Sequence, residues 1–399
     1  MKKKLEEVAM FENNPKWENS ISRVYDMYEP IYKDRSEFDR DYTRIINCNA
    51  YRRLKHKTQV FFSPKNDHIC TRLEHVNHVE SISNSIANYL GLNSELTRTI
   101  AVSHDLGHSP FGHKGEEILS EISEREFGER FWHGWNGKHL VDDLELLQDV
   151  DNVSKNLNLT YAVRDGILGH CGSPRVSGQK PRDEFVDLNE FTHSNKFYPY
   201  TWEGCVVKIA DNISYLGRDL EDAIEMKLIT RRDINSIDRS IEKIRLNNTS
   251  IIGYLVKDLC ENSTLEDGLK FSDEAYGIME KIRQFNYKKI YNNEKIQPTI
   301  RYFKVLMNEI FYTLKKEYAG MNTIDNIYKL NRYYPELSDG FSGWLEKYTN
   351  SDKKDTEKYD NKVVYDLNNE KDYYRAIIDY IAGMTDQYVV RIYSELISF

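Results

Sequence analysis

The stretch from His104 to Glu116, HDLGHSPFGHKGE, gathers three histidines, two carboxylates and three glycines. Imidazoles and carboxylates are the side chains that bind transition metals and move protons near neutral pH. The adjacent residues His104 and Asp105 end an apolar helix, and consecutive helical residues point about 100° apart. Both can therefore hold one metal ion only if the ion lies against that face or at the helix end.

Two distant residues could complete such a metal site. His75 stands in RLEH, and Asp211 stands in KIADNISYL. Two imidazoles and two carboxylates suit Mn, Fe, Mg, Ni or Zn, and leave coordination positions for water and phosphate oxygens. A water molecule bound to such an ion has a lowered pKa and can act as a nucleophile. Each of these residues alone is more often an ordinary polar group, so only the joint pattern indicates a metal.

Apolar residues at three- and four-residue steps predict helices along almost the whole chain. One helix runs from Val76 to Leu90 with Gly91 as its C-cap, and Ser94 is expected to cap the next helix. The best strand candidate is Thr58–Phe62. The other predicted helices are 138–157, 161–168, 203–228, 231–245, 251–262, 273–285, 297–317 and 372–396.

The histidines and one long loop divide the chain unevenly. All eleven histidines lie between His56 and His193, which predicts imidazole chemistry in the first half and a packed helical region after about residue 230, unless the clustering is chance. The segment Cys171–Tyr200 holds three prolines. A loop of this length in a compact domain is commonly a lid, a binding loop or disordered.

Composition indicates a globular chain in a reducing compartment. The 399 residues are 40% hydrophobic and 30% charged, with a net charge of -9, so nothing global points to nucleic acid or a membrane surface. The five cysteines form no C-x-x-C pair, which argues against thiolate zinc sites and a disulfide framework. We find no signal peptide and no bilayer-spanning apolar run, so a cytoplasmic location is expected.

Five segments carry a family resemblance. They are FDRDYTRIINCNAYRRLKHKTQVF (38–61), TRLEHVNHV (71–79), HDLGHSPFGHKGEEIL (104–119), LNLTYAVRDGILGH (157–170) and WEGCVVKIADNISYLGRDLEDAI (202–224). Together they resemble the deoxyguanosine triphosphate triphosphohydrolase-like branch of the HD-domain superfamily. The resemblance implies an all-α fold, with an HD-domain helical core at 38–230, an N-terminal extension at 1–37, C-terminal helices at 231–399 packed on the core, and at most a short β-hairpin.

The resemblance also implies residue roles. The metal ligands would be His75, His104, Asp105 and Asp211, and the catalytic pair would be His113 and Glu116, which can touch at i, i+3. The metal would be Mn²⁺ or Mg²⁺ foremost, with Fe, Co, Ni or Zn as alternatives. The substrate-binding residues would be Gln59, Arg72, His108, His133, Tyr215 and Asp219. For Arg72, an ion pair with Glu74 or a neighbour is the alternative.

The implied reaction is hydrolysis of a deoxynucleoside triphosphate, dGTP first, to deoxynucleoside and inorganic triphosphate. In our hypothesis metal-activated water attacks the α-phosphorus while His113 protonates the departing 5′-oxygen; the reverse role, His113 activating the water, is the close alternative. Other hypotheses are an HD-type phosphohydrolase acting on another nucleotide, or a dNTP-binding sensor with weak turnover.

The resemblance further implies partners. Family members self-associate as dimers or hexamers, and some respond to nucleotide or single-stranded DNA effectors; no membrane partner is expected. The chain departs from common family patterns at FWHGWNGKH (131–139), at Asn212 and at Ser109. These departures leave the implied chemistry in place and leave the base preference open.

Overall fold

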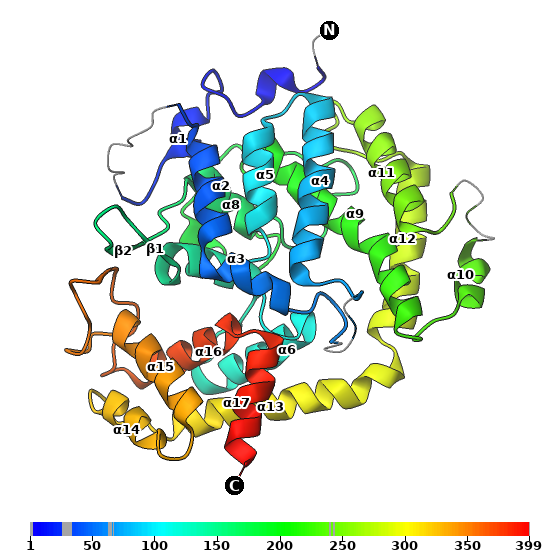
Figure 1. The fold of residues 1–399 in the computed structure, drawn as a ribbon. Helices are drawn as coiled ribbons and strands as arrows, with labels where there is room; N and C mark the ends of the chain where they lie inside the picture. The colour runs from blue at the N-terminus through cyan, green and yellow to red at the C-terminus, as the bar shows by residue number, and fades with distance from the viewer. Residues whose placement is uncertain are drawn as a thin grey trace. The chain divides into compact units, whose positions relative to one another are not determined.

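The protein is built almost entirely from helices, as predicted (Figure 1). The computed structural model describes residues 3–25, 34–62, 66, 68–238, 241 and 244–398. The chain divides into two compact units, each assembled from three separate segments. Unit 1 comprises Met1–Ile46, Lys65–Asp105 and Leu159–Gln297, and unit 2 comprises Asn47–Pro64, Leu106–Asn158 and Pro298–Phe399.

Unit 1 is organised around three helices that pack against one another, α4, α5 and α9. The helices α4 and α5 run side by side in Figure 1. The 24 residues of α9 are buried along most of their length, which is typical of a central helix. The helices of unit 1 are α1 (Trp17–Ile21), α2 (Glu37–Asn47), α4 (Arg72–Leu90), α5 (Ser94–Ser103), α8 (Tyr161–Gly169), α9 (Trp202–Glu225), α10 (Arg231–Asp238), α11 (Asn248–Asn262) and α12 (Asp273–Asn286).

Local capping residues determine where α4 begins and ends and where α5 begins. Thr71 and Glu74 form a capping box at the start of α4, and Gly91 ends the helix with φ of 89°, as predicted. The predicted cap of α5 was wrong by one residue. Asn93, not Ser94, is the N-cap, because its side-chain oxygen accepts the N–H groups of Glu95 and Leu96 at 3.0 and 3.1 Å.

Unit 2 has its own hydrophobic core, which joins the helix after the HDLGH segment to the C-terminal helices. Ile118 and Ile122 of α6 pack in one cluster with Leu306, Phe341 and Ile377. The helices of this unit are α3 (Asn49–Arg53), α6 (Gly112–Phe127), α7 (His133–His139), α13 (Gln297–Lys315), α14 (Thr323–Leu330), α15 (Pro335–Tyr348), α16 (Glu370–Gly383) and α17 (Asp386–Ile397).

Residues 138–157 were predicted as one helix, and this was wrong for their second half. After α7 and a wide helical turn at Leu140–Leu144, β1 (Leu146–Gln148) pairs antiparallel with β2 (Ser154–Asn156). The turn between them forms because the Asp149 carboxylate accepts the N–H groups of Asp151 and Val153. The strand β3 (Tyr359–Asp360) adds parallel to β2.

Three other predicted elements also differ. Within the described residues, 58–62 belong to no strand. The predicted helix 372–396 is two helices, because Thr385 accepts the N–H of Tyr388 and starts α17 anew. The helix predicted at 231–245 ends at Asp238, and residues 239, 240, 242 and 243 lie outside the described part of the chain.

The loop 171–200 is anchored by two buried cations of unit 1. Arg182 pairs with Asp165 at 2.6 Å and donates to the hydroxyl of Tyr161. Lys208 of α9 donates to the Asn195 side chain at 3.0 Å and to the Gly169 carbonyl at 3.1 Å. The loop is therefore tied to α8 through Arg182 and to α9 through Asn195.

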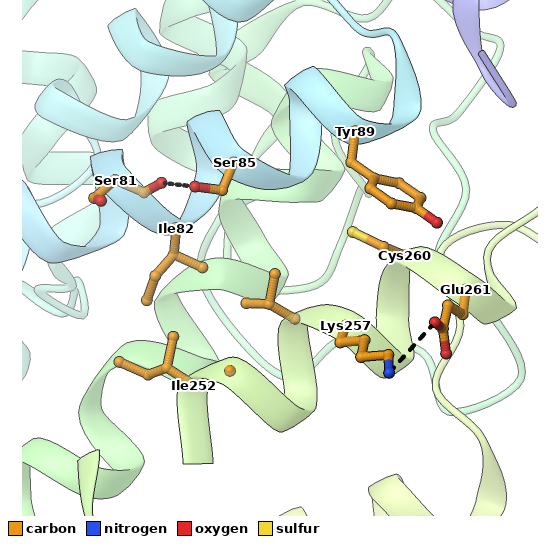
Figure 2. A pocket seen from close by; sticks show the side chains of 10 residues that line it. Ser81, Ile82, Ser85, Tyr89, Ile252, Lys257, Cys260 and Glu261 are labelled. Atoms are coloured by element: carbon orange, nitrogen blue, oxygen red, sulfur yellow. Dashed lines mark hydrogen bonds and ion pairs between the residues drawn. The ribbon is translucent and has the colours of Figure 1, made fainter. Parts of the chain in front are cut away.

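A shallow groove of about 420 Å³ opens between α4 and α11 (Figure 2). Its walls include Ile82 and Tyr89 from α4, and Ile252 and Cys260 from α11. None of the residues expected to do chemistry lines it.

Across the described residues, no helix combines the length and the apolar character needed to cross a bilayer.

Candidate functional site

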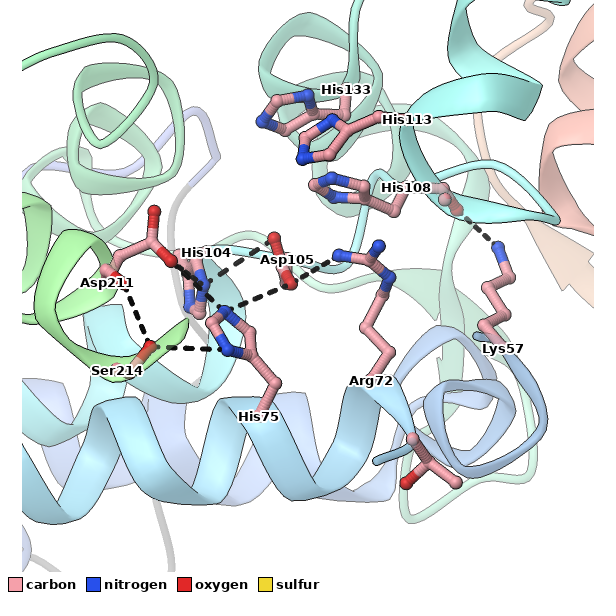
Figure 3. Close-up of polar contacts among 12 residues, drawn as sticks. Lys57, Arg72, His75, His104, Asp105, His108, His113, His133, Asp211 and Ser214 are labelled. Atoms are coloured by element: carbon pink, nitrogen blue, oxygen red, sulfur yellow. Dashed lines mark hydrogen bonds and ion pairs between the residues drawn. The ribbon is translucent and has the colours of Figure 1, made fainter. Parts of the chain in front are cut away.

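Unit 1 brings the four expected metal ligands together from three segments (Figure 3). His75 projects from α4, His104 and Asp105 directly follow α5, and Asp211 projects from α9. The ligand atoms of His75, His104 and Asp211 lie within 4.8 Å of one another. Asp105 completes the group, with Oδ1 3.5 Å from His104 Nε2 and Oδ2 3.7 Å from His75 Nε2.

The His104 ring offers a lone pair to the centre of this cluster. Its Nδ1 lies 2.7 Å from the Ala101 carbonyl, which can only accept, so Nδ1 carries the proton. Among the described residues, Nε2 is buried and has no hydrogen-bond partner. Burial lowers the pKa of His104 to about 4, although Asp105 opposes this effect. A neutral imidazole with a buried, unsatisfied acceptor is what a metal-ligating histidine looks like without its ion.

The Ser214 hydroxyl orients the His75 ring so that its Nε2 lone pair, like that of His104, faces the cluster. Ser214 donates its proton to the Asp211 carbonyl at 2.8 Å, so it accepts from His75 Nδ1 at 3.3 Å. The lone pair on His75 Nε2 then faces Asp211 Oδ1 at 3.1 Å. A lone pair directed at a carboxylate repels it unless a proton or a metal cation lies between them.

Charge balance around the carboxylates also suits a cation. Burial alone would raise the pKa of Asp211, but positive charge at His75 and His104, which these rings carry only when both of their nitrogens are protonated, holds it well below its ordinary value. Arg72, in the first turn of α4, donates to Asp105 Oδ2 at 2.6 Å, and both side chains are almost fully buried. The Glu74 carboxylate caps α4 by accepting the Thr71 N–H at 2.7 Å, and Asp105 is the carboxylate that forms the ion pair expected as the alternative role of Arg72. Two histidines and two carboxylates in this arrangement fit a divalent ion of the first transition row.

Unit 2 forms a second polar cluster around the Glu116 carboxylate. Glu116 Oε2 lies 2.9 Å from His133 Nδ1 and 3.5 Å from His113 Nδ1, and Oε1 accepts the His133 backbone N–H at 3.0 Å. Burial alone would raise the pKa of Glu116, but His133 and His113 hold it well below its ordinary value. The main partner of Glu116 is thus His133, and His113 remains two-thirds exposed. The His108 ring stacks on His133 at a centroid distance of 3.9 Å.

A strained turn places these imidazoles, and the C-terminal helices hold it. Phe111 and Gly112 both have positive φ, 63° and 60°, where α6 begins. Such a conformation is costly for phenylalanine. It is stabilised by Asp386 of α17, which accepts the Phe111 N–H at 2.9 Å, and by stacking of the Phe111 ring on Phe303 at 3.9 Å. The same Asp386 carboxylate accepts the Thr58 N–H at 2.8 Å, next to Gln59.

Of the remaining expected substrate-binding residues, one lies in unit 2 and two lie in unit 1. Gln59 is nearly buried in unit 2. Tyr215 and Asp219 follow Asp211 along α9 in unit 1, and Asp219 accepts a hydrogen bond from Tyr291. Burial raises the pKa of Asp219 to about 7. A partly protonated carboxyl beside a tyrosine can donate to and accept from a hydroxyl group of a ligand.

Sequence reasoning missed four residues that contact the expected site residues. Ser214 stands three residues after Asp211, so helical spacing could have found it. His170 packs edge-on against His104 at 4.9 Å, and Lys57 donates to the His108 carbonyl at 2.5 Å. Tyr291 reaches Asp219 from 72 positions away, and no motif marks it.

Two domain models and several related proteins match this chain. The HD domain model matches residues 72–216, and the phosphohydrolase-associated domain model matches residues 346–395. A deoxyguanosinetriphosphate triphosphohydrolase-like protein of Caldanaerobacter subterraneus subsp. tengcongensis is 32% identical over 91% of this chain and 85% of its own length. Proteins described in the same words are 37% identical over 69% and 73% in Desulfatibacillum aliphaticivorans, and 31% identical over 95% and 96% in Rickettsia bellii.

Proposed function

Because the chain belongs to the deoxyguanosinetriphosphate triphosphohydrolase-like family of HD-domain phosphohydrolases, we propose that it hydrolyses deoxynucleoside triphosphates, dGTP foremost. The products are the deoxynucleoside and inorganic triphosphate. The observation that carries the proposal is the pair of imidazole nitrogens, on His75 and His104, that face the Asp105 and Asp211 carboxylates. The similarity to these relatives also reaches beyond the sequence motifs, because the Rickettsia bellii protein aligns with 95% of this chain.

A divalent cation held by His75, His104, Asp105 and Asp211, with Mn²⁺ or Mg²⁺ foremost, would lower the pKa of water and offset phosphate charge. Arg72 supports this set by its ion pair with Asp105, which fixes the carboxylate. We assign Arg72 a second task, as an anchor for a phosphate oxygen, because guanidinium groups recognise phosphate bidentately.

The residues of unit 2 would handle the proton and the phosphates. Water attacks the α-phosphorus, the bond from phosphorus to the 5′-oxygen breaks, and that oxygen must gain a proton. His113 is the donor in this proposal, since its side chain is exposed and its Nδ1 lies 3.5 Å from the Glu116 carboxylate. His133, held by Glu116, and His108, stacked on it, would contact the triphosphate. Gln59 and Asp219 would bind the sugar, and Tyr215 would reach the sugar or a phosphate.

Product analysis tests the proposal directly. The protein is incubated with Mn²⁺ and each dNTP in turn, and the phosphorus products are resolved. Inorganic triphosphate is the expected product. Pyrophosphate or monophosphate would instead favour an HD phosphohydrolase acting on another nucleotide, and binding without turnover under several metals would favour a sensor.

A matched pair of variants tests the role of Glu116. Glu116→Gln keeps the shape of the side chain but removes its charge, so kcat should fall about 100- to 10,000-fold, the range for loss of a general acid–base group. Glu117→Gln is the control, because Glu117 is exposed and forms an ion pair with Lys114 on the surface of the same helix. Equal activity of the two variants would remove Glu116 from the mechanism.

A further inference from the structure

The cluster around Glu116 brings several possible metal-ligand atoms together, which proton transfer does not require. His108, His113, Glu116 and His133 each offer one ligand atom, and these four atoms all lie within 4.8 Å of one another. Three imidazoles and one carboxylate form a ligand set typical of tetrahedral zinc sites. We propose that these four residues form a zinc-binding site, separate from the His75–Asp211 cluster, and that zinc bound there inhibits the enzyme.

The distances within the cluster are close to those of a zinc site. Ligand atoms that are bound at about 2.1 Å in a tetrahedron lie roughly 3.4 Å apart. Glu116 Oε2 is already 2.9 Å from His133 Nδ1 and 3.5 Å from His113 Nδ1. The His108 ring lies over the His133 ring at a centroid distance of 3.9 Å and an angle of 32°, and it offers a ring nitrogen within 4.8 Å of the other three ligand atoms (Figure 3).

The ligand chemistry selects the metal. Nitrogen-rich sites bind Zn²⁺ more tightly than Mn²⁺, whereas Mg²⁺ and Mn²⁺ favour carboxylate, carbonyl and water oxygens. Three imidazoles therefore distinguish this cluster from the His75–Asp211 cluster, where half of the ligands are carboxylates. Access for the ion is open, because the His113 side chain is 66% exposed.

Inhibition follows from the roles of these side chains. A nitrogen lone pair that is bound to zinc cannot accept a proton, and a coordinated Glu116 cannot stabilise an imidazolium. The inhibitory part of this inference rests on the proposed function. The metal-binding part stands on the geometry of unit 2 alone, so each part can fail separately.

Metal stoichiometry tests the binding. The metal-free full chain is titrated with Zn²⁺ by calorimetry, in competition with a chromophoric chelator. The wild type should bind two equivalents. His75→Ala/Asp211→Asn should keep one, His113→Ala/Glu116→Gln should keep one, and the combined variant should bind none. His56→Ala, an exposed histidine of unit 2, should bind two.

Folding is checked for every variant by circular dichroism and thermal unfolding. Because a variant could also fail to fold, the wild type is crystallised with Zn²⁺ and examined for anomalous scattering at the zinc edge. A peak among His113, Glu116 and His133 is expected. A single bound equivalent in the wild type, or two in His113→Ala/Glu116→Gln, would overturn the proposal.

Turnover is then measured on the manganese-loaded wild type. One added equivalent of Zn²⁺ should suppress triphosphate release while the electron paramagnetic resonance signal of bound Mn²⁺ stays unchanged. Loss of activity together with release of Mn²⁺ would mean that zinc acts at the other cluster, and would refute inhibition at this one. Absence of triphosphate release with Mn²⁺ alone would refute the proposed function and leave the zinc stoichiometry intact.

Discussion

His75 Nε2 lies 3.1 Å from Asp211 Oδ1, although the two residues are 136 positions apart in the chain. The hydroxyl of Ser214 holds the other ring nitrogen and is itself fixed by the Asp211 carbonyl. Imidazole and carboxylate therefore direct electron pairs at the same point. A cation at that point would convert this repulsion into coordination, and Ser214 would then belong to the proposed metal site without being a ligand.

Removing that hydroxyl should weaken metal binding and leave the fold intact. We expect Ser214→Ala to lower Mn²⁺ affinity about 10- to 100-fold, the usual cost of losing a residue that orients a ligating histidine. Calorimetric titration of the metal-free protein measures it. Ser85→Ala is the matched control, since the Ser85 hydroxyl donates to the Ser81 carbonyl of its own helix at 2.9 Å. Unchanged affinity in Ser214→Ala would mean that the His75 tautomer is set by other means.

Two helical glycines of unit 2 should respond oppositely to alanine. A Cβ on Gly115 would lie 1.8 Å from the Pro110 carbonyl oxygen, whereas a Cβ on Gly343 would meet no atom within 4 Å. Gly115→Ala should destabilise the protein by about 1–3 kcal/mol through overpacking. Gly343→Ala should stabilise it by about 0.5–1 kcal/mol through helix propensity. Denaturant unfolding of both variants measures these free-energy changes. A Gly115→Ala variant as stable as the wild type would show that the turn at Pro110 relaxes freely.

Asp386 should affect catalysis without touching substrate. Its two carboxylate oxygens accept the N–H groups of Thr58 and Phe111, beside Gln59 and at the turn before His113. An amide has only one acceptor oxygen, so Asp386→Asn leaves one buried donor unsatisfied at about 1–3 kcal/mol. We expect kcat to fall about 10- to 100-fold as the reacting groups shift.

The control for this experiment is Asp352→Asn, which changes an exposed aspartate of the same unit. Measurement of kcat and thermal midpoint in parallel separates positioning from stability. Loss of stability with full kcat in the surviving protein would assign Asp386 a purely structural role.

The His139 imidazole should make unit 2 sensitive to alkaline pH. Burial by itself lowers the pKa of His139, but Asp379 and Asp143 raise it to about 10, with contacts of 3.2 and 2.7 Å. Since this folded-state pKa lies above the unfolded value of about 6.5, the stabilisation is complete below pH 6.5. It then decreases as the pH rises and is lost through about pH 10.

His139→Gln should therefore cost roughly 3 kcal/mol at pH 6, because it removes the cation beside Asp379 and leaves Asp143 paired with Lys362 alone. The difference from wild type should close by pH 10.5. Thermal melts across this pH range measure it, with His56→Gln as the control for a histidine on the surface. A gap that is independent of pH would show that packing, not charge, carries the effect of His139.

Much of the fold could be predicted because its signals are local. The three- and four-residue spacing of apolar residues predicted six helices to within a few residues: α4, α8, α9, α11, α12 and α13. Glycine at position 91 ends α4 because only glycine adopts a left-handed conformation at little cost. The doublet His104–Asp105 and the motif through Glu116 identified the family, which the comparisons confirm.

Other features depend on contacts between residues far apart in the chain. Glu116 pairs mainly with His133, which is 17 positions away. The hydroxyl that orients His75 comes from Ser214, 139 positions away. The carboxylate that stabilises the strained Phe111 comes from Asp386, 275 positions away. Local propensity contains no term for such contacts, since their energy exists only once the chain has folded. The sequence determined the chemical identity of the reacting groups, and the tertiary structure decided their partners, their protonation and their strain.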